Sequence, residues 1–169
     1  MPINIGRHTY GTPIVKGQMN TVNIGSFCSI AENVVIDGGF NHNTSFISTF
    51  PFNQYWNLDL EGHPVCKGDV NIGNNVWIGQ DVKIMSGVTI GDYSVIASGS
   101  IVTKDVTDFA LYAGVPAKFV KRRFQIKDCC KLVEIKWWEW PDEEIKSIAH
   151  LLMSDKIHEL YEYHLNRNK

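Results

Sequence analysis

An aliphatic residue recurs at every sixth position between Ile72 and Thr107. The residues that open these six consecutive hexads are Ile72, Ile78, Ile84, Ile90, Ile96 and Val102. An α-helix repeats every 3.6 residues and a β-strand every 2, so neither produces a sustained period of six. Such hexads are typical of a parallel β-helix, in which each hexad forms one side of a three-sided coil. Residues three hexads apart then stack, and their aliphatic side chains fill a prism.

The other hexad positions fit the same coil. Small or β-branched residues stand fifth, where they fill the gaps beside the aliphatic columns: Val76, Val82, Val88, Ser94, Ser100 and Val106. Glycine follows the opening isoleucine in several hexads, which suits corners where a Cβ would clash. An ordinary sandwich of strands would match this pattern only by chance.

The hexads form two blocks with a long interruption between them. Residues 24–41 and 72–107 carry the pattern, whereas residues 1–23 look irregular. The interruption, residues 42–71, is rich in aromatic side chains, so we expect it to pack on something. A loop this long inside a compact fold is usually functional. The sequence therefore predicts a β-helix domain over residues 1–107 with an inserted loop.

The composition changes after the hexads end. Residues 108–123 read as a bridge, interrupted by Gly114 and Pro116. Apolar residues at helical spacing follow, and Pro141 with three acidic residues after it suits the first turn of a helix. We therefore predict an all-β domain followed by a bridge and helical segment at 108–169, with its three neighbouring tryptophans in packing roles.

Overall composition limits the classes of function. Hydrophobic residues make up 44% of the chain and charged residues 20%, as in ordinary globular proteins. A net charge of −2 argues against nucleic acid as the main partner. No apolar run reaches the roughly 18 residues of a membrane span, and the N-terminus lacks a secretory signal, so we expect a cytoplasmic protein. The cysteines have no C-x-x-C spacing, which gives no indication of a zinc site or a redox pair.

His42 is the first candidate for catalysis, because it stands where the coils give way to the loop. Loops held by a rigid scaffold are common sites of catalytic groups. An imidazole also titrates near neutral pH, so it can take a proton from a hydroxyl. His63 lies in the same loop and is the second candidate for the base. A surface or packing role is the alternative for either histidine.

A cluster of basic residues follows the coils: Lys118, Lys121, Arg122, Arg123 and Lys127. Lysine and arginine are natural partners of phosphate, so the cluster could anchor a phosphorylated ligand. A solvated face is the alternative. The chain has no Walker-type glycine loop, so a nucleoside triphosphate is not indicated.

Several motifs together resemble a known family, the hexapeptide-repeat acyltransferases of the xenobiotic acetyltransferase branch. This branch includes chloramphenicol and streptogramin acetyltransferases and many sugar O-acetyltransferases. The motifs span almost the whole chain: Ile24-Gly-Ser-Phe-Cys-Ser-Ile30, Asn41-His42, Ser48-Thr-Phe-Pro-Phe52, the segment from Lys67 to Gly79, Ala113-Gly-Val-Pro-Ala-Lys118 and Ile135-Lys-Trp-Trp-Glu-Trp-Pro141.

The resemblance implies a left-handed parallel β-helix that assembles as a homotrimer and uses acetyl-CoA bound between two subunits. It assigns the catalytic base to His42. It also implies contacts to acetyl-CoA, which we expect from Gly79, Ala97, Thr103, Lys104, Lys118 and Lys121. Contacts to the acceptor are expected from Tyr10 and Asn41. No metal is implied.

The implied reaction is a direct transfer of the acetyl group to an acceptor hydroxyl. Nothing in the sequence pairs a serine or cysteine nucleophile with a base, as an acyl-enzyme would require. A backbone N–H at a coil corner, such as that of Gly79, is expected to stabilise the oxyanion.

The acceptor is less defined by the sequence. The chain is shorter than the antibiotic-modifying members, and its loop after Phe52 is abbreviated, which favours a sugar or surface-polysaccharide acceptor over an antibiotic. Two readings from other classes stay open: a trimeric zinc enzyme of the carbonic anhydrase type, with too few histidines on the coils, and a scaffold without catalysis.

Overall fold

The computed structural model describes residues 2–17 and 19–167. The chain forms two compact units, Met1–Lys121 and Arg122–Lys169. The first unit holds the coils, which continue beyond the predicted end at residue 107.

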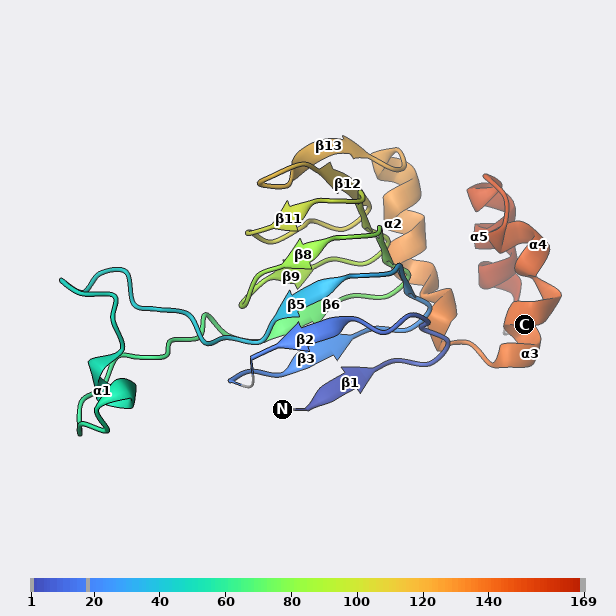
Figure 1. Cartoon of the computed structure of the whole chain (residues 1–169). Coiled ribbons are helices and arrows are strands. Elements are labelled where there is room, and N and C mark those ends of the chain that lie inside the picture. Colours follow the sequence, from blue (N-terminus) through green and yellow to red (C-terminus); the bar gives the residue numbers. More distant parts are fainter. Residues whose placement is uncertain (1, 18, 168–169) are drawn as a thin grey trace. The chain divides into compact units, whose positions relative to one another are not determined.

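Three parallel sheets form the sides of the first unit, an arrangement typical of a left-handed β-helix (Figure 1). The first sheet contains β1 (Ile3–Ile5), β3 (Val22–Ile24), β6 (Val70–Ile72) and β9 (Thr89–Ile90). The second contains β4 (Ser29–Ile30), β7 (Trp77–Ile78), β10 (Val95–Ile96), β12 (Ala110–Ala113) and β13 (Lys118–Arg122). The third contains β2 (Ile14–Lys16), β5 (Val35–Asp37), β8 (Lys83–Ile84) and β11 (Ile101–Val102).

The registers between strands confirm the predicted stacking. Ile72 pairs with Ile90, Ile78 with Ile96, and Ile84 with Val102. These aliphatic side chains are at most 4% exposed, and the small fifth-position residues beside them are buried too. The interior of the prism is therefore the hydrophobic core of this unit.

The strand pairing on either side of the inserted loop agrees with the bounds predicted for this loop. Ile24 on β3 pairs with Ile72 on β6, and asparagines in the same two strands are 48 residues apart. This separation is one coil of three hexads plus the 30 residues of the interruption, 42–71. We call residues 42–71 the arm. It projects from the coils in Figure 1 and carries one short helix, α1 (Phe52–Tyr55).

The prediction that residues 1–23 are irregular is wrong, because they form the first coil. β1 and β2 pair in parallel with β3 and β5, so this segment is a coil. Ile5 pairs with Ile24, whereas Ile14 pairs with Val35, so the spacing differs between two sides of the same coil. Extra residues at the corners hide the period of six in the sequence.

The bends of the coils lie at the fourth residue of most hexads. There the backbone has a positive φ of 52–70° at Phe27, Asn33, Asn75, Asp81, Tyr93 and Gly99. Glycine at the second position has another cause, which is the close approach of the next coil. A Cβ on Gly79 would lie 2.6 Å from the backbone nitrogen of Ser98. The predicted Cβ clash is confirmed, but the prediction that the chain bends at these glycines is wrong, because the positive φ lies two residues later.

The second unit is helical, as predicted. It contains α2 (Ile126–Ile135), the 3₁₀ helix η1 (Trp137–Glu139), α3 (Asp142–Ser147), α4 (Ala149–Leu152) and α5 (Ile157–Asn166). Pro141 directly precedes α3, whose first turn holds three acidic residues. The neighbouring tryptophans are 4–7% exposed, in agreement with a packing role. In the part of the chain that the structure describes, no helix is both long and apolar enough to cross a membrane.

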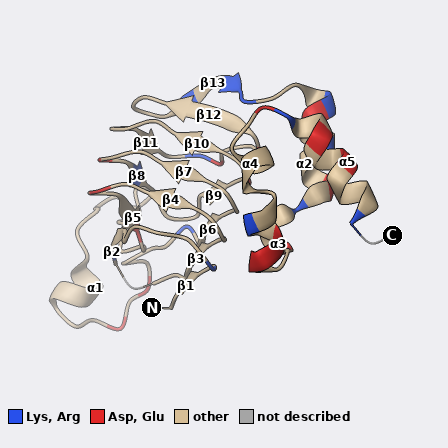
Figure 2. Ribbon diagram, turned by 90° about the vertical axis from the view of Figure 1, so that its right-hand side faces the viewer, with Lys and Arg blue, Asp and Glu red and all other residues tan. Residues whose placement is uncertain are grey.

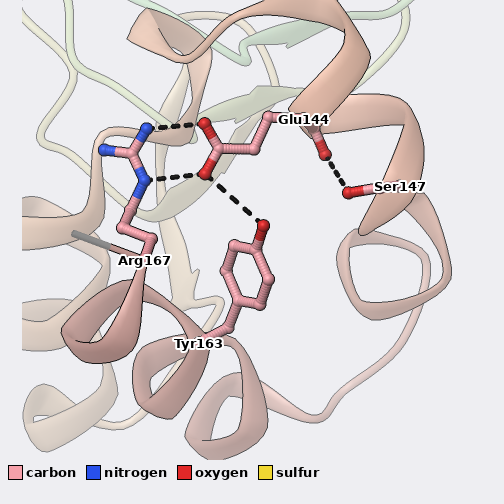
Figure 3. A network of polar contacts seen from close by, with 4 residues as sticks. All are labelled: Glu144, Ser147, Tyr163 and Arg167. Atoms are coloured by element: carbon pink, nitrogen blue, oxygen red, sulfur yellow. Dashed lines mark hydrogen bonds and ion pairs between the residues drawn. The ribbon is translucent and has the colours of Figure 1, made fainter. Parts of the chain in front are cut away.

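An ion pair joins the first turn of α3 to the end of the chain in this unit. Arg167 donates to both carboxylate oxygens of Glu144, at 2.7 and 2.6 Å (Figure 3). The hydroxyl of Tyr163 also faces Glu144, and the Arg167 guanidinium lies 4.2 Å from the ring centroid of Trp140. The Arg167 guanidinium holds the pKa of the Glu144 carboxyl below its usual range.

Candidate active site

Asn41 clamps the base of the arm to the coils. Its backbone forms an antiparallel bridge with Val65, with hydrogen bonds of 2.9 and 2.7 Å. Its side-chain amide donates to the carboxylate of Asp37 at 3.2 Å and to the hydroxyl of Ser86 at 3.1 Å. Both amide hydrogens are thus used within the protein, and only the amide oxygen is left for the predicted contact to an acceptor.

His42 follows this clamp directly and is exposed. Its Nδ1 lies 2.5 Å from the backbone carbonyl oxygen of Thr49. A carbonyl oxygen only accepts hydrogen bonds, so Nδ1 carries the proton of the neutral ring. The lone pair of Nε2 is therefore available, which is the form that a general base requires.

A polar cavity surrounds His42. It has a volume of about 490 Å³ and is lined by Asn41, His42, Asn43, Thr44, Val65 and Lys67. Lys67 brings a positive charge to this lining, next to the candidate base. Lys67 opens one of the family-like motifs, but the sequence assigns it no role, since only the return of the arm to the coils brings it into the same cavity as His42.

His63 lies beside His42, with ring centroids 5.4 Å apart. The backbone N–H of Asn43 donates to Nδ1 of His63 at 3.2 Å, so the proton of this neutral ring is on Nε2. His63 thus has no lone pair free to take a proton. Of the two histidines predicted as candidate bases, the geometry supports His42.

A second, apolar cavity lies on the His63 side of the arm. It has a volume of about 480 Å³ and is lined by Ser45, Phe46, Ile47, Ser48, Phe50, Phe52, Asn53, Leu60, Glu61 and His63. The arm's aromatic rings pack on one another, for example Phe50 on Phe52 with centroids 4.8 Å apart. Several apolar side chains nevertheless stay open, with Ile47 fully exposed and Trp56 60% exposed.

Gly79 and Ala97 are neighbours on one edge of the prism, as predicted, because they directly follow the paired Ile78 and Ile96. The N–H of Gly79 donates to the carbonyl of Ile96 at 2.8 Å. This group is therefore occupied, and the prediction that it stabilises the oxyanion is wrong. The sequence indicated the corner but not the ladder of hydrogen bonds between coils that uses its N–H.

Thr103 and Lys104 lie at the next corner, after β11 of the third sheet, and both are exposed. The arm leaves the same sheet after β5, so His42 and Lys104 belong to one edge of the prism at different coils. Tyr10 is 66% exposed and pairs with Ser29 beside the second sheet. Within one chain, the structure therefore does not bring Tyr10 to the arm.

Lys118 and Lys121 lie on β13, whose residues are all exposed. Figure 2 shows the basic residues gathered on this strand. Side chains alternate between the two faces of a strand, so residues three positions apart point in opposite directions. The two lysines therefore do not share one face of β13, which the spacing of the sequence alone did not resolve.

Comparison with known proteins identifies relatives of this chain. The family described as "Bacterial transferase hexapeptide (six repeats)" matches residues 69–104. A probable macrolide acetyltransferase from Lysinibacillus sphaericus is 45% identical over 139 residues, covering 78% of this chain and 77% of that protein. A chloramphenicol acetyltransferase from Agrobacterium fabrum is 40% identical over 148 residues, covering 83% and 70%.

A solved structure supports the fold. A maltose O-acetyltransferase from Clostridium difficile 630 is 30% identical, with a TM-score of 0.52 over 73% of this chain and 60% of that one. Its identity is lower than that of the macrolide and chloramphenicol acetyltransferases.

Proposed function

Since this chain belongs to the hexapeptide-repeat acetyltransferases, in the xenobiotic acetyltransferase branch, and is an acetyl-CoA-dependent O-acetyltransferase, we propose that its acceptor is an antibiotic of the chloramphenicol or macrolide type. This acceptor differs from the sugar that the sequence analysis favoured. The relatives that cover most of this chain carry the names of antibiotic acetyltransferases, and they support the proposal.

The apolar cavity of the arm is the observation that carries this proposal. Its lining has five large apolar side chains and only one charged carboxylate, Glu61. A sugar presents hydroxyls on all sides and needs many polar partners, whereas a largely apolar ring system gains from burial against aromatic and aliphatic groups. The abbreviated arm favours a sugar at the level of the sequence, but the short arm still forms an open cavity of about 480 Å³.

His42 acts as the general base in this proposal. Nε2 takes the proton of the acceptor hydroxyl, and the oxygen attacks the thioester carbonyl of acetyl-CoA. The bond from carbon to sulfur then breaks, and the imidazolium returns the proton to the sulfur, so that CoA leaves as a thiol. The bond from Nδ1 to the Thr49 carbonyl keeps the ring in the required tautomer and stabilises the charged ring.

Lys67 contributes the positive charge near the oxyanion. Negative charge develops on the thioester oxygen during attack, and a cation that is already in place stabilises it. Lys67 lines the same cavity as His42, which supports this role now that the Gly79 N–H is known to be occupied.

Acetyl-CoA is proposed to run along the edge of Gly79 and Ala97, past Thr103 and Lys104, with Lys118 and Lys121 near its phosphates. Because the arm and the edge of Gly79 lie at different corners of the prism, we propose that the site is completed between subunits of a homotrimer. The exposed apolar side chains of the arm, such as Ile47 and Trp56, support an interface there.

A thiol-release assay tests the proposal. Each reaction contains the protein, acetyl-CoA and one acceptor. The acceptors are chloramphenicol, a macrolide, a galactoside and maltose. We expect kcat/KM for at least one antibiotic to exceed that for either sugar. Faster turnover of a sugar would restore the sugar acceptor, and sedimentation of the protein as a monomer would remove the shared site.

A further inference from the structure

Two residues that line the apolar cavity each carry a buried polar atom without a partner in the described part of the protein. His63 and Asn53 both line this cavity. Within the described residues, Nε2 of His63 and Oδ1 of Asn53 are buried and have no hydrogen-bond partner. Buried polar groups without partners are uncommon in native proteins, and each one calls for an explanation.

The chemical character of both atoms follows from their neighbours. The Asn43 N–H occupies Nδ1 of His63, so Nε2 is the donor of the neutral ring. The amide nitrogen of Asn53 donates to the backbone carbonyl of His63 at 2.6 Å, which fixes the orientation of this amide. Its Oδ1 is therefore an acceptor. Two residues of the cavity lining thus carry one unsatisfied donor and one unsatisfied acceptor, beside five large apolar side chains.

A hydrogen bond links Asn53 to His63, and a ring contact links His63 to the base. Asn53 holds the backbone of His63, and the His63 ring lies against the ring of His42. The His63 ring thus connects the two cavities: His63 lines the apolar cavity, and its neighbour His42 lines the polar one.

Phe46 packs on the His63 ring. Its ring meets the His63 ring edge-on, with centroids 5.5 Å apart, and its side chain is 46% exposed. Exposed side chains at binding surfaces commonly change rotamer when a ligand enters. Rotation of Phe46 would open a path to Nε2 of His63 without a change in the backbone.

We propose that His63 and Asn53 determine acceptor specificity: Nε2–H of His63 donates to an oxygen of the acceptor, and Oδ1 of Asn53 accepts from its hydroxyl or amide N–H. The ligand class is a mostly apolar molecule that carries one polar group with both a donor and an acceptor. This inference rests on the proposed antibiotic acceptor and assigns the residues that recognise it. Neither residue takes the proton, so both position the acceptor for His42.

Two replacements of His63 distinguish the roles of its two ring nitrogens. His63→Asn keeps an acceptor near the position of Nδ1, so the contact with the Asn43 N–H is retained while the donor is lost. His63→Gln keeps a donor near the position of Nε2. We expect His63→Asn to raise KM for the preferred antibiotic about 10- to 100-fold, with KM for acetyl-CoA unchanged, and His63→Gln to recover part of this loss.

Chloramphenicol analogues lacking the secondary hydroxyl or the amide carbonyl supply the second arm of the test. One of these analogues lacks the oxygen that accepts from Nε2 of His63. With that analogue, His63→Asn should not raise KM further, because the hydrogen bond is already absent in the wild-type protein. Nitrogen NMR of the histidine rings in the wild-type protein should show His63 protonated at Nε2, and its signal should shift when chloramphenicol is added.

The outcomes distinguish this proposal from the proposed function. If the wild-type protein acetylates an antibiotic but His63→Asn has the wild-type KM, the recognition role of His63 is refuted and the antibiotic acceptor stands. A His63 ring protonated at Nδ1 in the wild-type protein refutes it as well. If no antibiotic is acetylated by the wild-type protein, both proposals fail together.

Discussion

The rings of His42 and His63 lie 5.4 Å apart and carry their protons on opposite nitrogens. The Thr49 carbonyl accepts from Nδ1 of His42, whereas Nδ1 of His63 accepts from the Asn43 N–H. Two chemically identical side chains thus leave opposite kinds of nitrogen unused, an acceptor in His42 and a donor in His63, because the backbone groups around them differ.

The first prediction concerns His42. His42→Asn keeps a donor for the Thr49 carbonyl but removes the basic nitrogen. We expect kcat to fall roughly 10²- to 10⁴-fold, with little change in KM for acetyl-CoA, since the base acts on the proton transfer and not on binding. Steady-state thiol release measures both constants. A variant that keeps kcat within a factor of a few would show that another group is the base.

Lys67 should affect the chemical step more than binding. Lys67→Met removes the charge while keeping most of the side-chain volume, and we expect kcat to fall by about 10-fold or more. Lys67→Arg is the matched control and should retain most of the rate because the charge remains. Loss confined to KM for the acceptor would mean that Lys67 binds substrate and does not stabilise the oxyanion.

The lysines of β13 should act on phosphate recognition. Lys121→Ala is expected to raise KM for acetyl-CoA several-fold and to have little effect with acetyl-dephospho-CoA, which lacks the 3′-phosphate. Lys118→Ala tests the other proposed phosphate contact separately, because this lysine points to the opposite face of the strand. Equal losses of Lys121→Ala with both cofactors would remove the 3′-phosphate contact.

Gly79 should be important for stability, because a side chain at this position would collide with the next coil. Gly79→Ala would bring a Cβ within 2.6 Å of the Ser98 backbone nitrogen, so the two coils must separate. We expect a loss of about 1–3 kcal/mol in the free energy of unfolding, measured with denaturant. Gly99→Ala is the control for strain alone: its φ is +70°, but a Cβ there meets nothing within 4 Å. It should cost about 1 kcal/mol.

The pair of Glu144 and Arg167 should make stability depend on pH. The pKa of Glu144 is lowered in the folded protein, so unfolding takes up a proton when the pH lies between the folded and unfolded pKa values. Its contribution is present above roughly pH 4.3, the ordinary pKa of glutamate, and is lost as the pH falls through the lowered value.

Thermal unfolding of Glu144→Gln tests this expectation. At pH 7 the variant should be less stable than the wild type by about 1 kcal/mol, because the side chains are about one fifth exposed and the pair is partly screened. The difference should shrink at low pH. Glu143→Gln is the control, since the side chains of its pair with Lys146 are 86% and 70% exposed. A Glu144→Gln difference that stays constant with pH would contradict the assignment.

The sequence by itself determined the prism and the place of the arm. Each hexad must place an aliphatic residue inward and then bend, so the same pattern repeats in consecutive residues of the sequence. The pairing of Ile24 with Ile72 therefore followed from counting hexads. The family motifs also marked His42. The first coil could not be predicted from the period of six, because extra residues at its corners interrupt that period.

Tertiary structure decided what each group near the site can do. The proton positions of His42 and His63 depend on Thr49 and Asn43, which reach them only because the arm folds back on itself. The occupied N–H of Gly79 depends on the next coil. Hydrogen-bond partners are set by contacts between distant segments, and a repeat that specifies inward packing carries no information about them.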